Sequence, residues 1–121
     1  GEAIPWCGLF TAVVVLRAGK RPVDAPLWAM NWRRFGDEAA RAILGDVLVF
    51  QRAAGGHVGF YIAEDPDCFH LLGGNQHDAV SIVRVARSRC VAMRRPPYAV
   101  KPASAVPVSM AASGDVSFDE A

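Results

Sequence analysis

The stretch Gly45–Ala63, GDVLVFQRAAGGHVGFYIA, decides the fold that the sequence predicts. Val47–Phe50 is a short apolar run of the β-forming type, and His57–Ala63 is a second one. Between the two runs lie residues 53–56, Ala-Ala-Gly-Gly, and the paired glycines suit the loop of a hairpin. This stretch therefore predicts two antiparallel strands joined by a short loop.

Further short strands are predicted after this hairpin, at Cys68–Leu72, Ala79–Val85 and Cys90–Met93. Turn sequences separate the first of them from its neighbours: Glu64-Asp65-Pro66-Asp67 on one side and Gly73-Gly74-Asn75-Gln76 on the other. Because the strands follow one another closely, with no room for helical crossovers, we expect an antiparallel meander rather than βαβ units.

The chain before the hairpin is predicted to be helical. Cys7–Ala18 is almost wholly apolar and is followed by Gly19, which is typical of a buried helix with a glycine at its end, although the valine run leaves a strand as the alternative. Leu27–Phe35 predicts a short helix closed by Gly36, and Asp37–Leu44 a second short helical or irregular piece. The predicted fold class is α+β: a buried N-terminal helix carrying a cysteine, packed on a small antiparallel sheet.

The bulk properties are those of one globular domain. The chain has 121 residues, of which 52% are apolar and 21% charged, and its net charge of +1 points neither to nucleic acid nor to a strongly acidic partner. No apolar run is long enough to span a membrane and no signal peptide is recognisable, so localisation stays open. Residues 99–121 lack periodicity, and we therefore expect a domain over residues 1–98 and a poorly ordered or extended tail over 99–121.

Cys7 is the candidate nucleophile. It follows Pro5-Trp6 and falls in the first turn of the predicted helix, where unpaired N–H groups and the helix dipole favour thiolate over thiol. The other two cysteines, Cys68 and Cys90, are interpreted as small buried residues. Since the chain has three cysteines, at least one has no partner for an internal disulfide, but the sequence does not exclude a disulfide between Cys68 and Cys90. The spacing of Cys and His fits no standard zinc site, and no metal or cofactor is predicted.

A base and an orienting group for Cys7 follow from the predicted sheet. If strands 57–63 and 68–72 are an antiparallel pair, the start of one faces the end of the other, and His57 and Asn75 come to the same edge. A helix packed across the sheet with its N-terminus at that edge places Cys7 beside His57. This is the arrangement in which an imidazole takes a thiol proton and a third polar group orients the imidazole.

Several short motifs occur in order along the chain and carry a resemblance to a known family. They are Pro5-Trp6-Cys7-Gly8, Gly45-Asp46-Val47-Leu48-Val49-Phe50, Gly56-His57-Val58-Gly59-Phe60-Tyr61, Gly73-Gly74-Asn75-Gln76 and Arg94-Arg95-Pro96. The ordered set resembles the CHAP and NlpC/P60 peptidoglycan hydrolases, which are papain-like cysteine hydrolases, and within them the small phage and prophage group. The resemblance covers residues 3–97.

The resemblance implies a papain-like fold, with Cys7 as nucleophile and His57 as general base. Many CHAP members carry a Glu two residues before an Asn; here that position is Gly73, so Asn75 is predicted to orient the imidazole. Gln76 and His77 are the alternatives for that role. The residues predicted to bind substrate are Trp6, Gly56 and Gln76. Relatives have a further segment before Pro-Trp-Cys, so a partner segment or protein is expected to complete the groove.

The function implied is hydrolysis of a peptidoglycan amide, within the stem peptide or between peptide and sugar, as an endopeptidase or an amidase. The expected context is phage or prophage lysis at the bacterial cell wall, reached from the virion or through the periplasm. Two alternatives remain. One is a catalytically degenerate module that binds the wall or forms part of a virion, and the other is an antibacterial amidase toxin.

Overall fold

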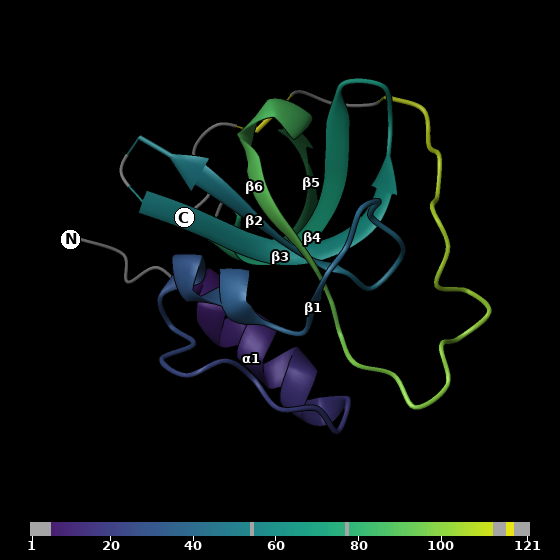
Figure 1. Ribbon diagram of the computed structural model, residues 1–121. Helices are drawn as coiled ribbons and strands as arrows, with labels where there is room; N and C mark the ends of the chain where they lie inside the picture. The colour runs from purple at the N-terminus through teal and green to yellow at the C-terminus, as the bar shows by residue number, and fades with distance from the viewer. Residues whose placement is uncertain (1–5, 54, 77, 113–115, 118–121) are drawn as a thin grey trace.

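Six antiparallel strands form a single sheet in the order β1-β6-β2-β3-β4-β5, and an α-helix packs against it (Figure 1). The computed structural model describes residues 6–53, 55–76, 78–112 and 116–117. The helices are α1 (Cys7–Arg17) and the 3₁₀-helices η1 (Ala29–Arg34) and η2 (Arg87–Arg89). The strands are β1 (Asp37–Glu38), β2 (Val47–Arg52), β3 (Gly55–Glu64), β4 (Cys68–Gln76), β5 (Ala79–Ala86) and β6 (Cys90–Arg95).

This architecture is dominated by the sheet, and the predicted fold class was wrong. We expected a papain-like α+β fold with a helix on a small sheet, whereas the described residues contain a six-stranded antiparallel sheet and one α-helix. The difference arises where glycine-rich or charged residues were interpreted as turns or helix. Gly73–Gln76 continues β4 instead of ending it, and Asp37–Glu38 pairs with β6. Backbone pairing with a neighbouring strand overrides local propensity at these positions.

The hairpin predicted from Gly45–Ala63 is confirmed. β2 and β3 pair from Val47 opposite Phe60 to Arg52 opposite Gly55. The meander continues through β4 and β5, as expected, but β6 returns to pair with β2 rather than with β5. As a result β2 lies inside the sheet, and its Val-Leu-Val-Phe run is buried on both faces.

Two apolar cores lie on opposite faces of this sheet. Val47, Val49, Val58 and Phe60 share one core with α1 and η1, while the alternate residues of the same strands, Leu48, Phe50 and Tyr61, belong to the other. The first core is the one that holds Cys7. The side-chain alternation of β2 and β3 therefore determines which residues face the helix.

The helix α1 confirms the predicted helical segment but not its complete burial. Its inward side is buried at Cys7, Gly8, Thr11, Ala12 and Val15, and its outward side exposes Leu9, Val13 and Leu16. Only glycine fits at position 8, because a Cβ on this residue would lie 2.2 Å from the carbonyl oxygen of Pro26. This close approach holds the first turn of α1 against the chain that leads into η1.

Residues after β6 run along the outside of the sheet in Figure 1 and rejoin it at the ends of β2 and β3. The Leu44 N–H donates to the carbonyl of Val106 at 3.0 Å, and the Glu64 N–H donates to that of Val108 at 2.8 Å. The Tyr61 hydroxyl accepts the Val108 N–H at 3.0 Å. The described part of the tail is thus an extended segment bonded to the sheet.

A buried ion-pair network closes the turn between β3 and β4. The Asp65 carboxylate accepts hydrogen bonds from His70 Nε2 at 2.6 Å and from Arg84 Nε at 2.9 Å. It also accepts the backbone N–H groups of Asp67 and Cys68. The Arg84 guanidinium, more than any other group, holds the pKa of Asp65 well below its usual range.

Asp65→Asn is expected to destabilise the fold by roughly 3 kcal/mol at about pH 7, because it removes the buried carboxylate that pairs with Arg84. Since the pKa of Asp65 is lowered, its contribution is complete above the ordinary Asp pKa of about 3.9 and is lost as the pH falls below that value. Thermal melts of parent and variant at neutral and acid pH measure the difference between their melting temperatures, and this difference should become smaller in acid. Asp67→Asn, at an exposed neighbouring carboxylate, is the control. A difference in melting temperature between parent and Asp65→Asn that is the same at every pH would contradict the expectation.

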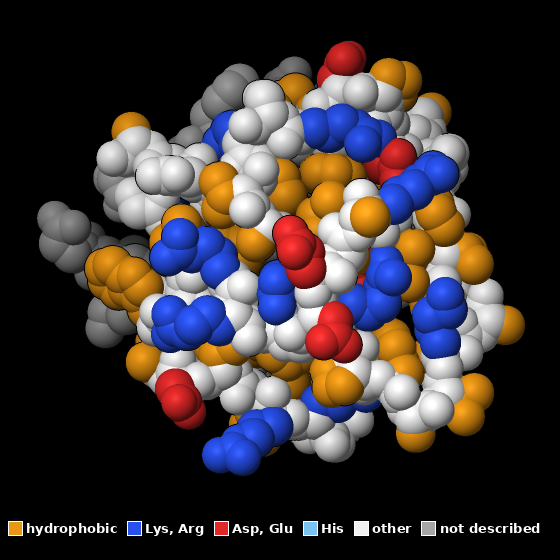
Figure 2. Space-filling model, in the orientation of Figure 1, with side chains coloured by type: hydrophobic (Ala, Val, Ile, Leu, Met, Phe, Trp, Pro, Cys, Tyr) orange, Lys and Arg blue, Asp and Glu red, His pale blue; other side chains and the backbone are white. Residues whose placement is uncertain are grey.

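Basic side chains are prominent on the face that carries α1, η1 and β1. Figure 2 shows Lys and Arg spread across this face, with fewer Asp and Glu among them. An anionic polymer would be attracted to this face.

Candidate active site

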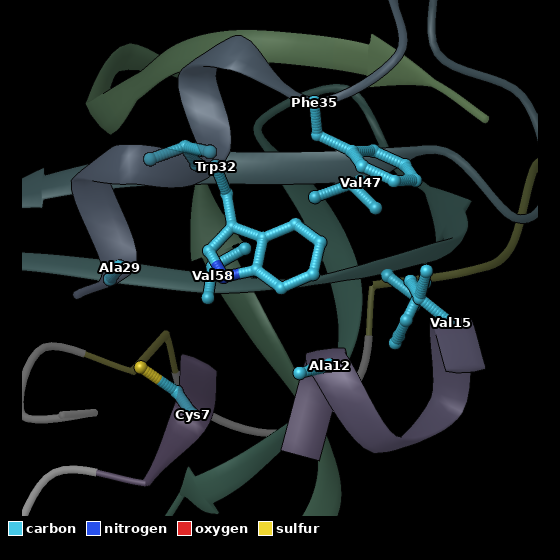
Figure 3. Packing of buried hydrophobic residues seen from close by; sticks show 10 residues of the cluster. Cys7, Ala12, Val15, Ala29, Trp32, Phe35, Val47 and Val58 are labelled. Carbon is cyan, nitrogen blue, oxygen red and sulfur yellow. The ribbon is translucent and has the colours of Figure 1, made fainter. Parts of the chain in front are cut away.

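Cys7 lies in the first turn of α1, where Trp6 precedes the helix and the Phe10 N–H already bonds the Trp6 carbonyl. Figure 3 shows its sulfur pointing away from Ala12 and Val15 of the same helix, with Ala29 and Val58 on the facing elements. The backbone N–H groups of Val58 and Gly8 hydrogen-bond the sulfur. The thiol therefore lies at the point where β3 passes from His57 to Val58.

The Cys7 thiol is not the resting thiolate that its place on the helix predicted. Cys7 is only 1% exposed, and this burial raises the pKa of the thiol above its ordinary value. The N–H groups of Val58 and Gly8 and the charge of Arg52 act in the opposite direction, lowering the pKa, but desolvation is the larger effect. At neutral pH the free protein thus holds Cys7 as a thiol, and a base must take its proton when it attacks.

His57 is fully buried in β3, and Gln76 at the end of β4 holds its ring. His57 Nε2 lies 2.8 Å from Gln76 Oε1. The Gln76 amide nitrogen donates to the carbonyl of Ser81 at 2.6 Å and to that of Leu71 at 3.3 Å, which orients its oxygen towards His57. An amide oxygen only accepts, so His57 carries a proton on Nε2.

Of the predicted orienting residues, Gln76 rather than Asn75 is therefore the one shown to hydrogen-bond the imidazole among the described residues. Asn75 is buried, with a left-handed φ of 58°, at a point where the β4–β5 register is interrupted between Gly73 and Gln76. The irregularity alters which side chain faces His57. Gln76 was the first of the two alternatives for the orienting role, and the other, His77, lies outside the described residues.

Gly73 and Gly74 of β4 approach different parts of the molecule. A Cβ on Gly73 would lie 2.5 Å from Gln76 Oε1 and 3.4 Å from His57 Nε2, so only glycine leaves room for that pair. A Cβ on Gly74 would lie 2.6 Å from the Phe10 Cβ and 2.8 Å from the Trp6 ring. Gly73 thus faces His57 and Gln76, whereas Gly74 faces Trp6 and the start of α1.

A cleft of about 540 Å³ opens at Cys7. Its described lining is mostly apolar and comes from the start of α1, the chain before η1, η1 itself and the β2–β3 hairpin. The lining residues are Cys7, Ala25, Pro26, Leu27, Trp28, Ala29, Met30, Arg52, Gly55 and Gly56. Of the residues predicted to bind substrate, Gly56 lines this cleft. The Trp6 ring packs on Gly74 instead, and the Gln76 side chain hydrogen-bonds His57.

Arg52 and Trp28 are the lining residues that sequence reasoning missed or left undecided. Trp28 is 68% exposed in the cleft wall, whereas Trp32 is fully buried in the core; their helical spacing had not distinguished them. Arg52 is a lone cation after the apolar run Val47–Phe50 and three residues before Gly55. Its position in the same hairpin as the predicted base His57 is the feature of the sequence that could have indicated Arg52.

All three cysteines are free thiols, so the Cys68–Cys90 bridge is not formed, and they differ in their surroundings. Cys7 lines the cleft, Cys68 is 1% exposed away from it, and burial raises the pKa of Cys90 to about 11. Iodoacetamide is therefore expected to alkylate Cys7 first, at a rate that climbs with pH because its thiol pKa is raised. Peptide mass spectrometry over a pH series measures this, with the unfolded chain as control; three equal rates in the folded protein would contradict it.

Within residues 6–53, 55–76, 78–112 and 116–117, no three His, Cys, Asp or Glu side chains cluster in a way that could hold a metal ion. In the same residues no helix has the length and apolarity needed to cross a membrane. No protein-family model matches the chain, and no curated protein or solved structure matches it. The case for a function therefore rests on the motifs and on the geometry around Cys7.

Proposed function

We propose that this chain is a cysteine amidohydrolase that cleaves an amide bond of peptidoglycan. The observation that carries the proposal is a cysteine that opens a helix and lines an apolar cleft, while the buried His57–Gln76 pair lies one residue along β3 from Val58. The Gln76 amide oxygen lies 2.8 Å from His57 Nε2 and so orients the imidazole. The wall as substrate comes from the ordered motif resemblance, and the basic face in Figure 2 suits an anionic polymer.

In the proposed reaction His57 takes the proton from the Cys7 sulfur as the sulfur attacks the amide carbonyl carbon. The oxyanion that forms is stabilised by the Cys7 backbone N–H, which has no partner within the helix because it belongs to the first turn. His57 then gives the proton to the leaving amine and the C–N bond breaks, which leaves a thioester on Cys7. Water attacks the thioester, His57 takes a proton from the water, and the carboxylic acid product leaves as the thiol is restored.

Purified walls incubated with the protein test this proposal. We expect the turbidity to fall and mass spectrometry to find one new free amine, whose position identifies the bond. An amine at the start of the stem peptide indicates an amidase, and an amine within the peptide an endopeptidase. Walls that gain no new amine at any point of a pH series from mildly acid to mildly alkaline would refute hydrolysis.

A wall-binding module without catalysis is the second candidate, and one observation favours it. Cys7 is 1% exposed, His57 is fully buried, and the Cys7 thiol has a raised pKa, all of which suit a packed rather than a reacting group. Such a module would sediment with walls and leave their amide bonds whole. Cosedimentation together with amine analysis on the same sample separates the two functions.

A further inference from the structure

Arg52 has an unusual position at the edge of the cleft. It ends β2, pairs with Gly55 across the hairpin and lines the same cleft as Cys7. Its Nε atom is buried and has no hydrogen-bond partner among the described residues. Arg52 is also the single charged side chain in the described lining of the cleft.

A buried guanidinium nitrogen without an acceptor is costly, because it has given up water and gained nothing in return. Buried polar atoms in folded proteins nearly always have a partner, so an exception at the wall of a cleft calls for an acceptor that arrives with the ligand. The acceptor that matches a guanidinium best is a carboxylate, which takes two parallel N–H bonds.

The apolar part of the lining complements this charge. Leu27 and Trp28 are more than half exposed. Met30 packs closely on Gly56, since a Cβ added to Gly56 would lie 2.6 Å from the Met30 sulfur. The Arg52 charge also reaches the Cys7 thiol, since it contributes to lowering the pKa of that group. Cation, apolar wall and nucleophile therefore belong to one binding site.

We propose that Arg52 recognises a free carboxylate of the substrate, next to the amide that Cys7 attacks, while Leu27, Trp28 and Met30 hold its apolar part. This inference rests on the proposed function and narrows it: the substrate is a peptide that carries an unamidated carboxylate beside the cleaved bond. Stem peptides whose carboxylate is converted to a carboxamide are then poor substrates.

Two alkylating agents of nearly the same size test the inference without any hydrolysis. Iodoacetate carries a carboxylate and iodoacetamide does not, and the ratio of their rates at one thiol cancels any change in that thiol's pKa. We expect this ratio at Cys7 to exceed the ratio at Cys68 and Cys90 of the same molecule by about tenfold, the scale of a charge-assisted hydrogen bond. Peptide mass spectrometry reads all three thiols in one sample.

Arg52→Gln is expected to bring the Cys7 ratio down to that of the other two thiols, and Arg52→Lys to leave it in between, because lysine keeps the charge but loses the planar fork. Arg17→Gln is the matched control, since it removes the same charge from an exposed position at the far end of α1. Melting curves of each variant check the fold. The inference is overturned if the parent shows no preference for iodoacetate, if the preference survives Arg52→Gln, or if Cys7 reacts with neither agent.

Failure of the proposed function would look different. In that case the walls would gain no amine, while the preference of Cys7 for iodoacetate would persist and depend on Arg52. Where walls are cleaved, a synthetic stem peptide and its carboxamide extend the test to substrate. kcat/KM for the free acid should exceed that for the carboxamide in the parent, and the two values should converge in Arg52→Gln.

Discussion

Cys7→Ala is expected to lower the rate of wall digestion by at least about a thousandfold, because the variant has no atom that can form the thioester. The fold should survive, since Ala fits where a small buried thiol was and the neighbouring elements are held by other contacts. The measurement is the release of new amines from purified walls, alongside thermal melts of parent and variant. We expect a shift in Tm of only a few degrees.

Cys68→Ala is the matched control, because it removes an equally buried thiol that lies away from the cleft. It should digest walls at the parent rate. Cys7→Ser is a second test of the nucleophile. Its hydroxyl keeps the shape of the thiol but is much harder for His57 to deprotonate, so this variant should also digest walls far more slowly than the parent. Parent-level digestion by purified Cys7→Ala would eliminate the thiol mechanism, whatever the melts show.

Gln76→Leu is expected to reduce kcat about a hundredfold or more, because the imidazole loses the acceptor that holds its proton on Nε2. With that acceptor gone, the ring can rotate or change tautomer and present the wrong nitrogen to the thiol. The substitution also leaves the Ser81 and Leu71 carbonyls without their donor, at a cost of about 1 to 3 kcal/mol. Kinetics and melting temperatures measured on the same preparation separate the two effects.

Asn75→Gly is the control for Gln76→Leu, since glycine tolerates the φ of 58° at that position. It should keep most of the activity. Gln76→Glu keeps an oxygen acceptor for His57 Nε2 and should therefore recover part of the activity lost in Gln76→Leu, with an altered pH profile. Equal losses in the Gln76→Leu and Asn75→Gly proteins would show that the β4 irregularity, not the His57–Gln76 bond, is what matters.

The elements that local pattern predicts well are the hairpin and the helix. The apolar runs Val47–Phe50 and His57–Ala63 pair as expected, although Gly55 and Gly56 belong to β3 and not to the loop, and α1 begins at Cys7 and ends before Gly19. These features depend on residues that are close in sequence, so the chain itself contains the information. The fold class was wrong because the lengths of β3 and β4, and the return of β6 to β2, depend on pairing with distant strands.

The amino-acid sequence by itself determined which chemical groups are present and in what order: a cysteine opening a helix, a histidine opening a strand and polar side chains after two glycines. Only the tertiary structure decided how they act on one another. The irregularity in β4 selected Gln76 over Asn75 as the partner of His57, because one residue of displacement changes which side chain faces the ring. Burial against η1 and β3 raised the pKa of the Cys7 thiol, although the helix N-terminus favours the thiolate. The folded chain also leaves the buried Nε of Arg52 without a hydrogen-bond partner among the described residues. Both effects come from desolvation, which depends on the assembled fold and not on local sequence.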